Sequence, residues 1–151
     1  MLTRRKFIKN ASLTAASSLS FAGYGFANAL DLPGVRRVNL ELSSLPTVWD
    51  GLTILQISDV HAGPYMGAER MAKLREMAMR LEPDMIVFTG DQMDRRPSDA
   101  ELFVSGFSGI EAPLGTWGIL GNHDHFIDPK RSEWALEAAG IQPLVNRGVV
   151  L

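Results

Sequence analysis

Three short apolar runs, at residues 52–57, 85–88 and 117–120, most strongly constrain the fold of this chain. They are rich in the branched and aromatic side chains that suit buried β-strands. Between the first two runs, residues 67–82 change to helical spacing, with one apolar face formed by Met71, Leu74, Ala78 and Leu81. This strand–helix–strand repetition predicts an α/β fold, in which helices pack on a parallel or mixed sheet.

Local signals indicate further elements. Residues 98–101 read Ser-Asp-Ala-Glu, the pattern of a capping box that opens a helix. Asp128 followed by Pro129 predicts another helix start, and Gly140 predicts the end of that helix. Three additional segments are typical of strands, at residues 38–42, 143–145 and 148–151.

Composition excludes several classes of protein. Apolar residues make up 46% of the 151 residues and charged residues 21%, as in ordinary globular domains. The chain contains no cysteine, which excludes disulfide scaffolds and thiolate chemistry. Residues 1–29 hold four of the 15 basic residues and no acidic ones, which leaves 11 basic against 17 acidic residues in 30–151. An acidic body of net charge −6 offers no surface for the phosphate backbone of nucleic acid.

Residues 1–29 have the three-part layout of a secretory signal. A basic start precedes an apolar stretch rich in Ala, Ser and Thr, and Ala27-Asn28-Ala29 places small residues at the two positions that a signal peptidase reads. Residues 3–9, Thr-Arg-Arg-Lys-Phe-Ile-Lys, resemble the twin-arginine export motif. We expect the twin-arginine machinery to export residues 30–151 to the periplasm or the outer face of the cytoplasmic membrane. The alternative interpretation is a basic amphipathic helix.

Polar residues follow each of the three apolar runs, at residues 58–61, 89–94 and 121–125, and all three histidines of the chain lie there. Asp59 and Asp91 are 32 residues apart, and Asp91 and Asn122 are 31 apart. Each interval is about one βα unit, and successive units bring equivalent positions to the same edge of a sheet. Asp59, Asp91 and Asn122 should therefore converge, with His61 beside Asp59.

The converging side chains are those of a metal site. Several carboxylates in one cleft repel each other unless a cation neutralises them. Carboxylate, amide and imidazole ligands together favour Mn, Fe or Zn. Asp91 is placed to bridge two metals, which at about 3.5–4 Å apart can bind one phosphate and activate a shared water. His123 is a candidate general acid, and Asp124 a candidate residue to hold the His123 imidazole in the required tautomer.

Each residue taken alone has a simpler interpretation. An aspartate after a strand is often a cap or turn residue, and Gly-Asn is a common turn pair. His125 is either near the site or merely solvated. Asp94 is expected to be a hydrogen-bond partner or to pair with Arg95 or Arg96. Those two arginines could contact a phosphate or form a solvated face.

Together, the three motifs resemble those of the calcineurin-like metallophosphoesterases. They are Asp59-Val60-His61, Gly90-Asp91-Gln92-Met93-Asp94 and Gly121-Asn122-His123-Asp124, in family order and with family-like spacing. The resemblance implies a four-layer α/β/β/α sandwich with two divalent metals. It implies that Asp59 and His61 bind the first metal, Asp91 bridges, Asn122 binds the second, and His123 donates a proton or contacts phosphate.

The resemblance extends to the bacterial, exported phosphodiesterase branch. Some members of that branch act on lipid-linked nucleotide pyrophosphates, which implies a small phosphoester or lipid-linked nucleotide as substrate and a membrane-proximal location.

The chain departs from the family pattern after residue 125, beyond which it contains no histidine. The family supplies further metal-binding histidines from downstream, so we expect residues 30–151 to be the N-terminal half of such a domain. We accordingly expect the polypeptide by itself to have little or no activity. The alternative function is a non-catalytic exported relic or binding domain. A dinucleotide-binding fold is disfavoured, because no Gly-x-Gly-x-x-Gly loop follows the first apolar run.

Overall fold

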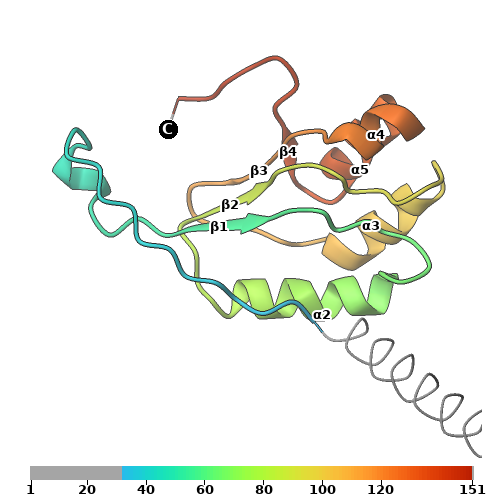
Figure 1. Cartoon of the computed structure of the whole chain (residues 1–151), viewed down its shortest axis with the longest axis horizontal. Coiled ribbons are helices and arrows are strands. Elements are labelled where there is room, and N and C mark those ends of the chain that lie inside the picture. Colours follow the sequence, from blue (N-terminus) through green and yellow to red (C-terminus); the bar gives the residue numbers. More distant parts are fainter. Residues whose placement is uncertain (1–31, 151) are drawn as a thin grey trace, which may run out of the picture. The chain divides into compact units, whose positions relative to one another are not determined.

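The structure is a computed structural model that describes residues 32–150 (Figure 1). The expected export signal at residues 1–29 lies outside the described residues. The elements, in chain order, are η1 (Thr47–Trp49), β1 (Ile54–Ile57), α2 (Ala68–Met79), β2 (Met85–Phe88), α3 (Asp99–Phe107), β3 (Thr116–Gly118), α4 (Asn122–Ile127), α5 (Pro129–Ala138) and β4 (Gln142–Pro143). Among the described residues, no helix has both the length and the apolar character needed to cross a bilayer.

The strands form one parallel sheet in the order β1-β2-β3-β4, as the strand–helix repetition predicted. Ile57 pairs with Phe88, and Phe88 pairs with Gly118, so the last residues of β1, β2 and β3 lie in one row. This register brings the loops that carry the candidate site residues to the same edge of the sheet.

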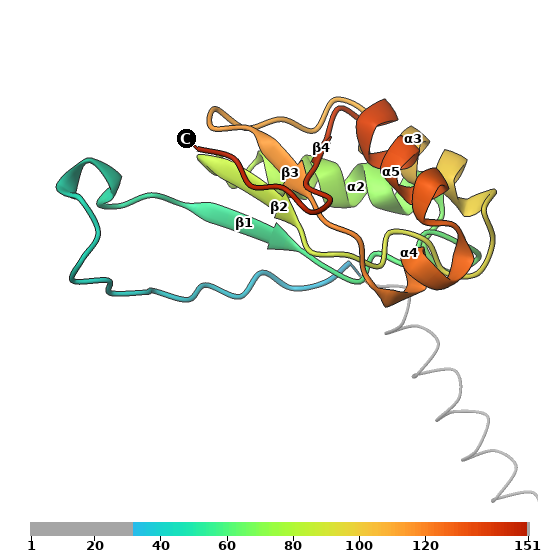
Figure 2. The same ribbon diagram turned by 90° about the horizontal axis from the view of Figure 1, so that it is seen from above.

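Helices α2, α3 and α5 pack on one face of this sheet, whereas α4 lies beyond the ends of the strands (Figures 1 and 2). On that face the ring of Phe88 meets the rings of Phe103 and Phe107 from α3, with centroids 5.7 and 5.1 Å away. On the opposite face Ile54 remains 54% exposed and Ile119 43% exposed. The described residues thus account for one sheet and one layer of helices. The second sheet of the expected four-layer sandwich is not among them.

Helix α2 confirms the helical spacing expected for residues 67–82. Met71, Leu74 and Ala78 form its buried face. On the solvent side Lys73 Nζ lies 2.8 Å from Glu69 Oε1, one turn away. This hydrogen bond, together with the attraction between the charges, lowers the pKa of Glu69 and raises that of Lys73.

The capping box expected at residues 98–101 is wrong. Ser98 already has helical dihedral angles, and its side chain makes no capping hydrogen bond. The buried carboxylate of Asp99 accepts hydrogen bonds from the main-chain N–H groups of Arg95 and Arg96, at 3.1 and 2.8 Å. The N–H groups of Asp99 and Ala100 donate to the main-chain oxygens of Arg96 and Pro97. The first turn of α3 is therefore hydrogen-bonded to the loop after β2.

Helix α5 begins and ends as expected. The Asp128 side chain accepts from the N–H of Arg131 at 3.1 Å, and Gly140, just beyond the helix, has a left-handed φ of 87°. Helix α4 was not among the elements that the sequence patterns predicted. Its start is stabilised by Asp124, whose carboxylate accepts the N–H of Gly121 at 2.9 Å.

Two expected strands, at residues 38–42 and 148–151, are not strands in the part of the chain that is described. Val38, Leu40 and Leu42 alternate as a strand requires, yet all three are exposed. A strand forms only when a neighbour accepts its hydrogen bonds, and residues 32–150 place none beside either segment. The strand expected at 143–145 overlaps the observed β4, Gln142–Pro143, only at Pro143, because residues 144 and 145 are not in a strand.

We predict that Gly106→Ala destabilises the fold. A Cβ at position 106 would lie 2.4 Å from Cβ of Met71, where α3 crosses α2. The clash should lower the free energy of unfolding by about 1–3 kcal/mol, despite the better helix propensity of alanine. Urea denaturation followed by circular dichroism measures this change. Gly148→Ala is the control, since nothing lies within 4 Å of the added carbon there, and equal stability of both variants would contradict the prediction.

Candidate metal centre

Beyond the ends of β1 and β2, the two following loops continue side by side. The N–H of Asp59 donates to Gly90 O at 3.2 Å, and the N–H of His61 donates to Asp91 O at 3.0 Å. A parallel bridge between Ala62 and Met93 extends the pairing further. These bonds hold the first candidate loop in register with the second.

Three candidate ligands adopt the left-handed backbone conformation, which residues other than glycine rarely adopt. The φ angles are 54° for Asp59, 47° for His61 and 57° for Asp91. Asp and His are among the residues that tolerate this region, at a cost of about 1–3 kcal/mol each. Residues held in such conformations cluster at functional sites, where the surrounding structure imposes them.

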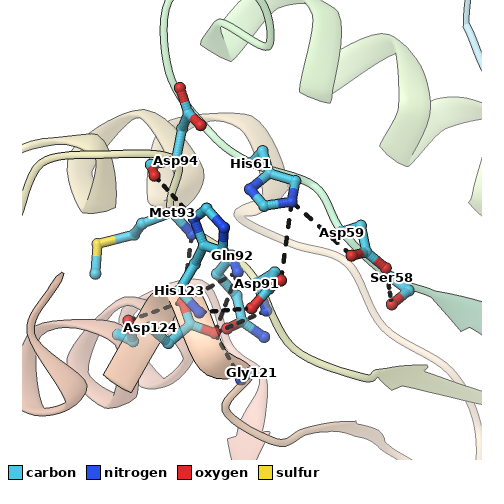
Figure 3. Close-up of polar contacts among 11 residues, drawn as sticks. Ser58, Asp59, His61, Asp91, Gln92, Met93, Asp94, Gly121, His123 and Asp124 are labelled. Carbon is cyan, nitrogen blue, oxygen red and sulfur yellow. Dashed lines mark hydrogen bonds and ion pairs between the residues drawn. The ribbon is translucent and has the colours of Figure 1, made fainter. Parts of the chain in front are cut away.

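The imidazole of His61 lies between the two carboxylates (Figure 3). Its Nε2 is 3.9 Å from Asp59 Oδ1 and 3.8 Å from Asp91 Oδ2, and the three potential ligand atoms all lie within 4.8 Å of one another. Asp91 is buried, His61 is half-buried and Asp59 is exposed, so the group opens to solvent on the side of Asp59. Two carboxylate oxygens and one imidazole nitrogen at this spacing fit a divalent cation of the Mn, Fe or Zn type.

His123 lies beside this group. The centroid of its ring is 4.6 Å from that of the His61 ring, and the two ring planes are at 80°. The main-chain N–H of His123 donates to Asp91 Oδ1 at 2.9 Å. Its Nδ1 is 3.1 Å from the main-chain oxygen of Asp94. A carbonyl oxygen only accepts, so Nδ1 carries the proton and Nε2 is the nitrogen left for chemistry. His61, Asp94 and His123 form a second group whose potential ligand atoms lie within 4.8 Å of one another.

The structure corrects the expected role of Asp124. Its carboxylate does not hold the His123 imidazole, whose orienting partner is the Asp94 carbonyl. Asp124 is fully buried and accepts hydrogen bonds from main-chain N–H groups and from the Ser132 hydroxyl. The reason is geometric, because successive residues of a helix point about 100° apart. When His123 faces the loops after the strands, Asp124 points into the protein.

The remaining candidates lie around this centre. Asn122 is the exposed first residue of α4, next to His123, and its role as a ligand stays a prediction. His125 is exposed. Asp94 pairs with Arg95, with Oδ2 3.2 Å from Nε, which is one of the two partners expected for it.

Two glycines allow the second and third loops to touch. A Cβ on Gly90 would lie 2.6 Å from the Gly121 Cα, and a Cβ on Gly121 would lie 2.1 Å from Asp91 Oδ1. Glycine permits this close approach of the two main chains because it has no Cβ.

The residues that sequence reasoning missed are buried partners. Ser132 of α5 hydrogen-bonds Asp124, and Gln92 is buried, with its Nε2 donating to Ile119 O at 2.9 Å. One signal was available in the sequence. An acidic residue three positions after Gly121 matches the acidic half of a capping box, and this pattern predicts a carboxylate turned back onto the backbone.

We predict that Gly121→Ala displaces the Asp91 carboxylate and weakens metal binding. The added carbon would occupy the place of the Asp91 carboxylate, so Mn²⁺ affinity should fall by at least roughly 10-fold. Isothermal titration calorimetry with MnCl₂ measures this change, with Gly148→Ala as a control. Unchanged affinity in Gly121→Ala would show that the close approach of the loops is not needed for binding.

Comparisons with known proteins identify the family of this chain. A family model described as calcineurin-like phosphoesterase matches residues 52–148. The chain is 30% identical, over 96% of its length, to a transmembrane protein with metallophosphoesterase domain from Bos taurus, of which it covers 33%. It is 31% identical, over 82% of its length, to the uncharacterized metallophosphoesterase YkuE of Bacillus subtilis, of which it covers 46%.

A third relative has a named substrate. The chain is 34% identical, over 76% of its length, to the UDP-2,3-diacylglucosamine pyrophosphatase LpxG of Chlamydia trachomatis, of which it covers 36%. The chain thus spans less than half the length of each of these relatives. No solved structure matches it significantly. On the match of the family model to residues 52–148, this chain belongs to the calcineurin-like phosphoesterase family.

Proposed function

We propose that this protein contributes to metal-dependent hydrolysis of a phosphoester, with a phosphodiester as the preferred substrate. The observation that carries the proposal is the meeting of Asp59, His61 and Asp91, whose potential ligand atoms lie within 4.8 Å of one another. Carboxylates this close repel each other unless a cation lies between them. The family match supports the same chemistry.

The residues would divide the work as follows. Asp59 and His61 would hold one divalent ion, Asp91 would be shared between two, and Asn122 would serve the second. Bound Mn, Fe or Zn would supply Lewis acidity toward the phosphate oxygens and would lower the pKa of water. Asp91 is suited to the shared position because it is buried and because its Oδ1 is already held by the N–H of His123.

His123 would supply the proton for the leaving oxygen. Its Nδ1 is turned to the main-chain oxygen of Asp94, and this hydrogen bond holds the ring in one orientation. Nε2 of the same ring is then the atom that can release a proton when the ring is charged.

The substrate class follows from a relative. The name of LpxG gives a lipid-linked nucleotide pyrophosphate as its substrate. We infer that the present protein acts on a small phosphodiester or a lipid-linked nucleotide of this type. The second candidate function is a non-catalytic exported binding domain, which is favoured by the small donor set at the second ion. Within residues 32–150 we assign only Asp91 and Asn122 to that ion.

We predict that Asp91→Asn abolishes any Mn²⁺-dependent hydrolysis of bis(p-nitrophenyl) phosphate by the chain, a rate that we expect to be low in the wild type. Loss of the shared carboxylate should reduce the rate by at least roughly 100-fold, since even residues that only support a ligand cost 10–100-fold. Release of p-nitrophenolate is followed spectrophotometrically in the purified full chain. If wild type and Asp91→Asn are equally inactive while wild type still binds Mn²⁺, the binding domain is the correct interpretation.

We also propose export through the twin-arginine pathway. Replacing Arg4 and Arg5 together by lysine should retain the protein in the cytoplasm, because the paired arginines are the distinctive part of the motif at residues 3–9. Cell fractionation and immunoblotting of an expressing bacterium measure the location. Continued export of the double variant would contradict the proposal, and Lys9→Arg serves as the matched control.

A further inference from the structure

Asp124 is a buried charge that the proposed chemistry does not use. The residue is 0% exposed, and its partners are not cationic side chains. Its carboxylate accepts from the N–H groups of Asp91 (2.8 Å), Gln92 (3.0 Å), Met93 (3.3 Å) and Gly121 (2.9 Å), and from Ser132 Oγ (3.0 Å). A buried carboxylate is tolerated only when its oxygens are satisfied in this way.

These five donors come from three separate parts of the chain. Residues 91–93 follow β2, Gly121 follows β3, and Ser132 lies on α5. Three consecutive N–H groups turned toward one anion require a bent main chain, and the left-handed φ of 57° at Asp91 is part of that bend. The carboxylate of Asp124 therefore selects the conformation of the loop that carries Asp91.

The main chain of Asp91 is held on both sides. Its N–H donates to Asp124 Oδ2, and its carbonyl accepts from the N–H of His61 at 3.0 Å. Its side chain is held as well, because Oδ1 accepts from the N–H of His123, the residue before Asp124. Figure 3 shows these contacts converging from both sides on Asp91. With all three groups fixed, Oδ2 is left facing His61 Nε2 at 3.8 Å.

We propose that Asp124 is the positioning residue of the metal centre. It touches neither the ion nor the substrate, and it acts by fixing the main chain of Asp91 so that the Asp91 carboxylate meets His61 and Asp59. The effect on metal binding rests on the proposed function, whereas the effect on the loop does not. Removing the anionic acceptor should release residues 91–93 and weaken metal binding while the sheet stays intact.

The test compares Asp124→Asn with wild type in the full chain. In this variant the NH₂ of the asparagine side chain replaces one carboxylate oxygen and faces the main-chain N–H donors, with which it cannot form hydrogen bonds. The side chain keeps its volume but loses its negative charge. Asp99→Asn is the matched control, because Asp99 is also buried and also accepts two main-chain N–H groups of the same loop, those of Arg95 and Arg96. Ser132→Ala is a milder variant that removes one of the five donors and keeps the charge.

The first measurement is amide hydrogen exchange by NMR. We expect Asp124→Asn to raise the exchange rates of the amides of residues 91–93 and 121 by at least roughly 10-fold, and to leave those of Ile86 and Phe88 in β2 unchanged. Asp99→Asn should leave residues 91–93 protected. A uniform increase across the sheet in Asp124→Asn would overturn the proposal, since Asp124 would then stabilise the whole fold rather than one loop. If that variant does not fold, the exchange rates of the same amides in Ser132→Ala decide the question.

The second measurement is calorimetric titration with MnCl₂. We expect Asp124→Asn to weaken binding by roughly 10–100-fold, as residues that support metal ligands do, and Asp99→Asn to leave it near the wild-type value. Faster local exchange with unchanged Mn²⁺ affinity would refute the claim that Asp124 acts on the metal centre. If the wild-type chain binds no Mn²⁺, the proposed function fails, and hydrogen exchange alone then decides whether Asp124 positions the loop.

Discussion

The carboxylate of Asp124 is the interaction on which the arrangement of the site depends. Its hydrogen bonds join the loop after β2, the loop after β3 and helix α5. The first two of these loops are about 30 residues apart in the sequence. An anion surrounded by N–H groups is a strong constraint, because a charged acceptor forms stronger hydrogen bonds than a neutral one. The result is a rigid frame behind the candidate ligands rather than among them.

The candidate ligands themselves are held in unfavourable conformations. Asp59, His61 and Asp91 all have left-handed φ angles, and Gly90 and Gly121 approach so closely that neither position accepts a side chain. Hydrogen bonds between the first two loops, and from the second of these loops to Asp124, offset this strain. Strain retained in this way at one edge of a sheet is a common property of functional sites.

The sheet has unequal faces. Helices α2, α3 and α5 bury one face, on which Phe88 contacts two phenylalanines of α3, while Ile54 and Ile119 stay exposed on the other. The candidate site lies beyond the carboxyl ends of the strands, where Asp59 is open to solvent and Asp91 is not. Under the proposed function, a substrate would therefore approach from the side of Asp59, and Asp91, the proposed shared ligand, would be covered by protein.

Much of the fold follows from local patterns. The strand at 85–88, the helix around Met71 and the cap at Asp128 are each indicated by a short stretch of sequence, and all three are present. The meeting of Asp59, His61 and Asp91 followed from equal spacing in a parallel sheet. Elsewhere the local patterns were insufficient. Ser98 makes no capping hydrogen bond to α3, and the N–H groups of Asp99 and Ala100 donate to the main-chain oxygens of Arg96 and Pro97. Residues 38–42 alternate like a strand but have no neighbouring strand among the described residues.

The amino-acid sequence by itself determined which chemical groups gather at the edge of the sheet, because repeating βα units place equivalent residues together whatever their surroundings. Only the tertiary structure decided the separate roles of His123 and Asp124. These neighbours point about 100° apart on a short helix that local patterns did not reveal. Packing of that helix against α5 and the loop after β2 turns the imidazole toward the site and the carboxylate into the interior.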